Sequence, residues 1–133
     1  MAQVLVKDKP YERFSPNKYG LAPSVTVNLR MLASGRTIVG KKALIDTGSE
    51  ITWIYPRDVK IDLSSDVDYN QTGEILVGID IEGNIYYIKC GYEDHEYAGT
   101  EEMIIGMDLL SQWLVELHGR RHLLSITHLE PDE

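Results

Sequence analysis

The stretch Ala43-Leu44-Ile45-Asp46-Thr47-Gly48-Ser49 decides how this sequence is interpreted. Its first three residues are the apolar end of a strand pattern, and they lead directly into an ionisable carboxyl group at Asp46. The small residues that follow can turn sharply and expose backbone N–H groups, so they could hold the carboxylate in a fixed position. The same residues also fit a plain Asx-type turn without a chemical role.

A second stretch, Met103 to Leu110, places an apolar strand, a glycine and a helical pattern in succession. Met107, Leu110 and Leu114 fall on one helical face, and Asp108 adds negative charge to the first turn. We therefore predict a short helix after Gly106.

These two stretches together resemble the motifs of one protein family. Ala43 to Ser49 resembles the hydrophobic-hydrophobic-Asp-Thr-Gly-Ser/Ala motif of aspartic proteases. Ile104 to Leu110 resembles the Ile-Ile/Leu-Gly-Arg-Asp/Asn-Leu-Leu motif of the retropepsins, the small retroviral-type members. The resemblance spans roughly residues 24–117, with the motifs in the family's order and close to its spacing.

The resemblance implies an all-β fold, a closed barrel or sandwich with one short C-terminal helix, which forms one half of a two-fold symmetric dimer. It implies an aspartic endopeptidase with catalytic residues Asp46, Thr47 and Gly48. One chain supplies one Asp-Thr-Gly, whereas the chemistry needs two carboxyl groups, so the partners would be a second copy of the chain and a polypeptide substrate. Thr47 would hydrogen-bond across the axis, and Gly106 and Ile105 would support the Asp46 loop. Water is the nucleophile, so no metal or organic cofactor is expected.

The resemblance also suggests substrate-binding residues. Gly73 and Glu74 lie where the family has its flap, a hairpin tip at residues 70–74. Glu50 would contact the substrate backbone. The Ser49 hydroxyl is expected to donate a hydrogen bond to the outer oxygen of Asp46. Met107 departs from the family's arginine, which leaves Glu50 without its usual ionic partner.

Strand patterns elsewhere favour hairpins, and residues 21–133 form the expected domain. Period-2 alternation and turn residues predict these strands: 25–31, 37–45, 51–55, 74–81, 84–90, 114–117 and 123–126. Residues 1–20 show no sustained period, so we predict an extended N-terminal arm.

Composition excludes several classes of protein. The chain has 133 residues and a formal net charge of -8, with no basic cluster, which argues against nucleic-acid binding. No apolar stretch approaches the ~20 residues of a membrane span, so no membrane partner is expected. Met1 to Pro10 does not resemble a secretory signal, so we expect a location in the cytoplasm or in a viral particle.

Other constellations indicate structure rather than chemistry. His118 and His122 have a metal-ligand spacing, but the residues between them predict a hairpin turn. The only cysteine, Cys90, ends an apolar strand and is expected in the core. The acidic residues Asp58, Asp62, Asp66 and Asp68 suggest a solvated face.

Two other functions remain open. A non-catalytic retropepsin-fold module for dimerisation or peptide binding is favoured by Met107 and by the long polar region before the flap position. A different β-barrel binding domain would make the Asp-Thr-Gly sequence a chance turn.

Overall fold

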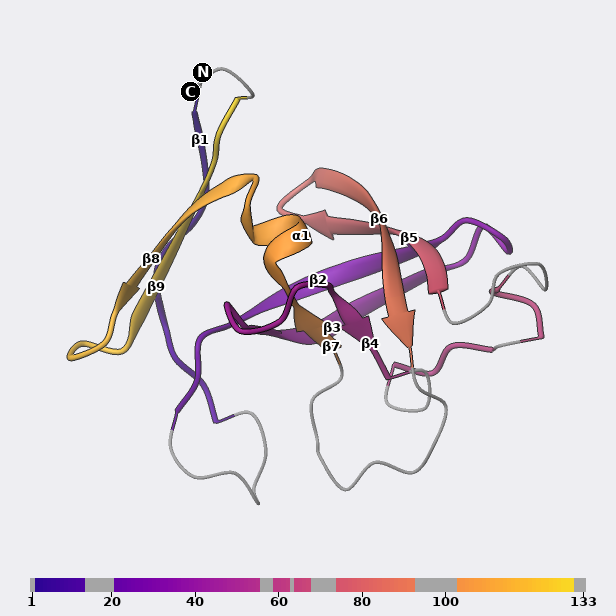
Figure 1. Cartoon of the computed structure of the whole chain (residues 1–133), viewed down its shortest axis with the longest axis horizontal. Coiled ribbons are helices and arrows are strands. Elements are labelled where there is room, and N and C mark those ends of the chain that lie inside the picture. The colour runs from indigo at the N-terminus through magenta and orange to yellow at the C-terminus, as the bar shows by residue number, and fades with distance from the viewer. Residues whose placement is uncertain are drawn as a thin grey trace.

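The computed structural model describes residues 2–13, 21–55, 59–62, 64–67, 74–92 and 103–130 (Figure 1). Within them lie nine strands and one helical turn. The elements are β1 (Gln3–Pro10), β2 (Ser24–Met31), β3 (Thr37–Ile45), β4 (Trp53–Ile54), β5 (Glu74–Ile81), β6 (Asn84–Tyr92), β7 (Met103–Ile105), α1 (Met107–Leu110), β8 (Trp113–His118) and β9 (Leu123–His128). The all-β expectation is thus confirmed.

Six strands close into a barrel in the order β2-β3-β7-β4-β6-β5. Side chains at alternate positions of each strand point inward and fill the barrel. In β2, for example, these are the buried residues Val25, Val27, Leu29 and Met31. The β5–β6 hairpin turns at Glu82 and Gly83, both with positive φ, as a tight two-residue hairpin turn requires. The predicted closed barrel and its hairpins are therefore present.

Two short parallel pairings set the position of the Asp46 loop. β3 pairs parallel with β7, and β4 pairs parallel with β6 and antiparallel with β7. The ends of β3 and β7 therefore lie side by side although they are distant in sequence. The loop after β3 and the helical turn after β7 leave the barrel at the same edge.

The N-terminal segment, which the sequence predicts to be an extended arm, contains a paired strand. Residues Gln3 to Pro10 form β1, which pairs with β9 in a second sheet ordered β1-β9-β8, with Leu5 buried. Two register shifts interrupt the pairing, and Asp8 has a φ of 49°. These irregularities break the alternation of apolar residues, so the strand left no periodic signal in the sequence.

The β1-β9-β8 sheet packs beside the barrel through an aromatic contact. The Tyr86 ring of β6 meets Trp113 edge-on at 5.5 Å between centroids, and the Tyr86 hydroxyl lies 2.8 Å from His128 Nδ1. Trp113 begins β8 and His128 ends β9. One barrel tyrosine therefore contacts two strands of the second sheet.

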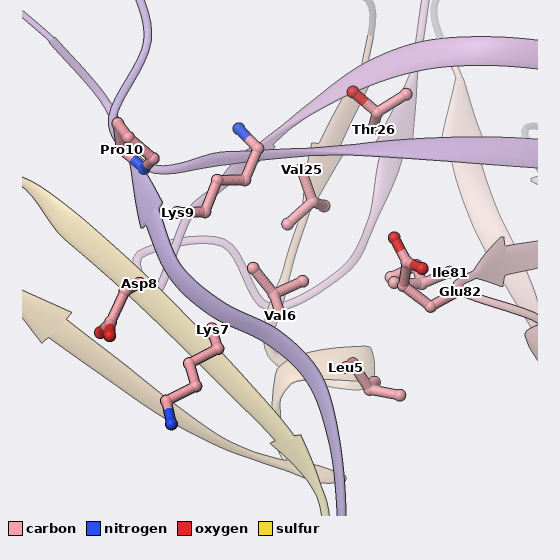
Figure 2. Close-up of a pocket in the computed structure, with 10 residues that line it drawn as sticks. All are labelled: Leu5, Val6, Lys7, Asp8, Lys9, Pro10, Val25, Thr26, Ile81 and Glu82. Carbon is pink, nitrogen blue, oxygen red and sulfur yellow. The ribbon is translucent and has the colours of Figure 1, made fainter.

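A groove of about 590 Å³ separates β1 from the barrel (Figure 2). The side chain of Val6 reaches toward Val25 across it, whereas Lys7 and Asp8 point away from the barrel. The groove is lined by ten residues: Leu5, Val6, Lys7, Asp8, Lys9, Pro10, Val25, Thr26, Ile81 and Glu82. None of them belongs to the predicted catalytic or substrate-binding set.

The predicted short helix follows Gly106, and the strand predicted over 114–117 lies within β8. α1 ends at Leu110, and Leu114 lies in β8 with its side chain 48% exposed. Leu109 and Leu110 are buried within the single turn, and Trp113 starts strand pairing opposite His128. That pairing ends the helix because the same residues cannot serve both structures. No helix in the described ranges is long and apolar enough to cross a membrane.

One member of the expected solvated acidic face is buried instead. Asp66 is 1% exposed, and its carboxylate accepts hydrogen bonds from Arg36 Nη2 at 2.5 Å, Ser34 Oγ at 2.5 Å and the Asp62 N–H at 2.8 Å. Arg36 also donates to the Lys60 carbonyl at 2.7 Å. Asp62 is exposed as predicted, and Asp58 and Asp68 lie outside the described residues. This cluster fastens the β2–β3 turn to the segment after β4.

The Asp66 cluster predicts an acid-sensitive contribution to stability. Hydrogen bonds from Arg36, helped by Ser34 and the Asp62 N–H, lower the pKa of Asp66 to about 2 from 3.8. The stabilisation is therefore complete well above pH 4, and about half of it remains at pH 3. Asp66→Asn should lower the free energy of unfolding by about 1–2 kcal/mol at pH 7 and by less at pH 3, as measured by urea titration.

Glu116→Gln, a neutralisation on the exposed side of β8, is the matched control and should change little at either pH. An Asp66→Asn effect that is equal at pH 7 and pH 3 would contradict the assignment of this stability to the ionised carboxylate.

Candidate active site

Asp46 follows β3 directly and is held by backbone hydrogen bonds at the barrel edge. The Asp46 N–H donates to the Ile105 carbonyl at 3.0 Å, and the Ile45 N–H donates to the Pro23 carbonyl at 3.0 Å. Its side chain is half-buried, whereas Thr47 and Gly48 are exposed at the tip of the loop. The loop therefore presents one carboxyl group from a fixed backbone.

The Asx-type turn considered above is present. Asp46 Oδ1 accepts the Gly48 N–H at 2.9 Å, and the Asp46 carbonyl accepts the Ser49 N–H at 3.2 Å. A Cβ at residue 48 would lie 3.2 Å from Asp46 Oδ1, so glycine lets the backbone approach the carboxylate. The turn therefore orients the carboxyl group, and the structural and chemical interpretations are compatible.

Gly106 and the first residues of α1 contact the backbone of the Asp46 loop and stabilise it. The N–H groups of Met107 and Asp108 donate to the carbonyls of Ser49 and Glu50, at 2.8 and 3.1 Å. A Cβ at Gly106 would lie 2.8 Å from the Ser49 carbonyl oxygen and would overlap the Ile51 carbonyl group. Only glycine allows this contact, which supports the role that the resemblance implied for Gly106 and, through its carbonyl, Ile105.

A side-chain pair that the sequence analysis missed completes this support. Thr52 is fully buried; its N–H donates to Asp108 Oδ2 at 3.0 Å and its hydroxyl donates to Asp108 Oδ1 at 2.8 Å. The Thr52 Oγ1 in turn accepts the Gly106 N–H at 3.2 Å. From the sequence, Asp108 is expected only as a negative charge in the first turn of the helix. Its position two residues after the glycine of the second motif is the signal in the sequence that it lies near the loop. We call Thr52, Gly106 and Asp108 the loop clamp.

The hydrogen bond expected from Ser49 to Asp46 is not the one that the structure contains. Ser49 Oγ donates to the Ile51 carbonyl at 2.7 Å. A hydroxyl has one proton to donate, so this bond within the loop takes the place of the expected one. The expectation for the Ser49 hydroxyl was therefore wrong.

The structure describes only some of the other residues that were predicted to bind substrate. Glu50 is exposed beside the loop, and Met107, which replaces the family's arginine, is 42% exposed. Glu74 is exposed at the start of β5. Gly73 and residues 70–72 of the predicted flap lie outside the described residues.

The alternative constellations have structural roles. His118 ends β8, and His122 lies in the β8–β9 turn, where its ring stacks on Tyr11 at 5.5 Å. Cys90 is fully buried, and burial, with a smaller effect of Asp108, raises the pKa of its thiol. Among the described residues, no group of three or more His, Cys, Asp or Glu side chains could hold a metal ion.

Comparison with known proteins identifies similar folds. No protein-family model matches the chain, and no curated protein matches it. A solved retropepsin-like aspartic protease from Rickettsia conorii is similar, with a TM-score of 0.60 and 15% sequence identity, over 98% of this chain and 97% of that one. The retroviral protease-like domain of Ddi1 from Leishmania major matches with a TM-score of 0.50 and 15% identity, over 86% of this chain and 98% of that one.

These two structures agree with the barrel that brings the two motifs of this chain together. The chain has the fold of the retropepsin-like aspartic proteases.

Proposed function

We propose that the protein is an aspartic endopeptidase that acts as a homodimer on extended polypeptide segments. One observation carries the proposal: the half-buried Asp46 carboxyl group sits on a loop whose backbone is hydrogen-bonded to β7 and α1, with the loop clamp beneath it. The buried Thr52 and the half-buried Asp108 fix the geometry of this turn, as a loop that must hold a reactive carboxyl group requires.

The proposed reaction uses two Asp46 carboxyl groups, one from each subunit, that share one proton. The ionised carboxyl takes a proton from water as its oxygen attacks the peptide carbonyl carbon, while the protonated carboxyl gives its proton to the carbonyl oxygen. The tetrahedral species then collapses: the C–N bond breaks, a proton passes to the amine, and the pair returns to its starting state. Water is consumed, and the residues need no metal or organic cofactor.

The second subunit would approach the exposed tip of the Asp46 loop. Thr47 and Gly48 lie at this tip, where a two-fold axis would bring the two loops together. The substrate would lie across both subunits as an added strand, with Ser49, Glu50, Gly73 and Glu74 near it.

The single buried cysteine is compatible with a reducing compartment, such as the cytoplasm or a viral particle. Processing of a polyprotein that contains the chain is one role for such an enzyme.

The competing proposal is a peptide-binding or dimerisation module with the same fold but without catalysis. The departure at Met107 favours it. Binding of peptide without turnover separates the two proposals.

Substitution of Asp46 tests the protease proposal directly. Asp46→Asn should abolish cleavage of a peptide library at mildly acidic pH, because the amide cannot exchange the proton that the reaction needs. Cleavage is measured by mass spectrometry of the products. The fold should survive, since the amide oxygen can still accept the Gly48 N–H.

Asp80→Asn is the matched control. Asp80 Oδ1 also accepts a turn N–H, from Gly83 at 3.0 Å, at the far hairpin. This variant should cleave like the wild type. Turnover by Asp46→Asn at the wild-type rate would contradict the protease proposal.

Activity should also depend on protein concentration. A lone subunit carries one of the two carboxyl groups, so specific activity should fall on dilution in parallel with the dimer fraction. The measurement is cleavage rate across a dilution series with sedimentation at the same concentrations. A monomer with full specific activity would refute the shared pair.

The loop clamp gives a further prediction. Thr52→Val keeps the shape but removes the hydroxyl that bonds Asp108 and the Gly106 N–H, so stability should fall by about 1–3 kcal/mol. We expect kcat to fall by about tenfold or more with a smaller change in KM, because the carboxyl is displaced while the binding surface remains. Thr52→Ser, which keeps the hydroxyl, should restore most of kcat. If Thr52→Val unfolds more easily but keeps wild-type kcat, the clamp supports the fold only.

A further inference from the structure

The groove between β1 and the barrel lies where strand pairing in the barrel stops. β2 pairs with β3 from Ser24 onward, but its register with β5 begins only at Asn28, opposite Asp80. Thr26 therefore has no strand partner on the β5 side among the described residues. Thr26 and Glu82, which follows the end of β5, both line the groove (Figure 2). The groove thus occupies the place where a further strand could continue the pairing beyond β5.

The backbone of Thr26 points toward this open side. The Pro23 carbonyl accepts a hydrogen bond from the Ile45 N–H of β3, so the carbonyl of Pro23 faces β3. Backbone groups of successive residues in a strand point to alternate sides, and the β2–β3 register is unbroken from Ser24 to Val27. Thr26, three residues after Pro23, therefore directs its N–H and C=O groups away from β3. An extended peptide in the groove could form hydrogen bonds with both groups.

The opposite wall of the groove is β1, which is also an edge strand. In the described sheet, ordered β1-β9-β8, it pairs with β9 alone. Figure 2 shows the yellow β9 on one side of β1 and β2 on the other, so the free edge of β1 lies on the side of the barrel. The groove volume of about 590 Å³ falls within the range of roughly 300–1,000 Å³ that is usual for ligand sites. A space of this size between two strand edges suits an extended chain.

Lys9 brings a cation to this groove, and its ammonium group lacks hydrogen-bond partners. The nitrogen is buried and makes no hydrogen bond with the described residues. Glu12 Oε1 lies 3.5 Å from it, and Glu12 Oε2 lies 3.4 Å from Lys42 Nζ, so two ammonium groups share one carboxylate. Both distances exceed the ~2.7–2.9 Å of a charge-assisted hydrogen bond. A carboxylate carried by an occupant of the groove would supply the acceptor that Lys9 lacks.

The direction of the Lys9 side chain differs from that of its neighbour Lys7. In Figure 2 Lys7 points away from the barrel, whereas Lys9 extends toward β2. The Lys9 side chain is 25% exposed, and its flexible four-carbon stem lets the ammonium turn into the groove. The half-buried Val6 reaches toward Val25 in the same groove and offers an apolar contact. The groove therefore combines two strand edges, one apolar side chain and one cation.

We propose that this groove is a second peptide-binding site, which holds an extended segment with a glutamate or aspartate side chain at Lys9. The segment would pair with the backbone of Thr26 and place an apolar side chain against Val6. Because the chain has a formal net charge of -8, an acidic peptide is disfavoured over much of the remaining surface. The inference goes beyond the proposed protease function, since the site can hold a peptide whether or not the Asp46 pair cleaves it. In a protease it would hold a part of the polypeptide away from the cleaved bond.

The test measures the binding of two proline-free peptide libraries to Asp46→Asn protein, in which cleavage is prevented. The libraries are identical except for their central residue, which is glutamate in one and glutamine in the other. The tightest glutamate peptide should bind at least about tenfold more tightly than its glutamine twin, as measured by fluorescence anisotropy. Equal binding of the twins would overturn the inference.

Substitutions on β1 test whether Lys9 is the cation that is recognised. Lys9→Met keeps the stem and removes the charge, so the preference for glutamate should disappear. Lys9→Arg keeps the charge and should retain most of the preference. Lys7→Met is the matched control, because it removes an equal charge from a side chain that points away from the barrel. Equal loss of preference in Lys7→Met and Lys9→Met would contradict recognition at Lys9.

Substitution of Thr26 tests whether the peptide lies in the groove. Thr26→Trp places a large ring in the groove from an exposed position, so it should weaken binding of both twins by at least about tenfold. Val39→Trp is the control, since Val39 is 68% exposed on β3 and does not line the groove. Urea titration establishes that each variant is folded. Unchanged binding to folded Thr26→Trp would overturn the placement of the peptide.

Cleavage assays with the wild type separate this inference from the proposed function. If the twins bind equally while the wild type cleaves peptides, the groove proposal fails and the protease proposal stands. If the preference for glutamate depends on Lys9 while the wild type cleaves nothing, the groove proposal stands and the protease proposal fails.

Discussion

The hydrogen bonds between Thr52 and Asp108 are the interaction on which the candidate site depends. Thr52 leads into β4 and Asp108 belongs to α1, so the pair joins the chain that leaves the Asp46 loop to the chain that follows β7. The Thr52 hydroxyl also accepts the Gly106 N–H, so one buried oxygen takes part in both contacts. Because a buried polar group without a partner is costly, each member of the clamp requires the other two. The clamp therefore restrains the backbone on both sides of the loop.

Barrel topology makes this clamp possible. The parallel pairing of β3 with β7 brings Asp46 and Gly106 to one edge, and the missing side chain at Gly106 lets two backbone segments approach within hydrogen-bonding distance. Parallel neighbours need a long connection between them. Here the connection contains β4, β5 and β6, which complete the same barrel. The chain that separates the two motifs thus builds the scaffold that brings them together.

Much of this could be predicted from sequence because its causes are local. The alternation of β2, the turn residues of the β5–β6 hairpin and the two motifs each lie within a few residues. What failed depends on distant partners. β1 is held by β9 despite irregular register, and Asp66 is buried because Arg36 reaches it from another turn. The Ser49 hydroxyl had two acceptors within reach of its sequence position, and sequence could not rank them.

Thr52 and Trp53 are neighbours in the chain, and their side chains point in opposite directions. Thr52 points inward and is fully buried in the clamp, while Trp53 points outward onto Gly91 and remains half-exposed. A change at Trp53 therefore alters the outer surface of the barrel, and the hydrogen bonds that hold the Asp46 loop stay intact. Thr52 has no such freedom, because its N–H and its hydroxyl both bind Asp108. With one residue fixed and its neighbour free to vary, the outer surface at β4 can change while the loop that carries the carboxyl group keeps its support.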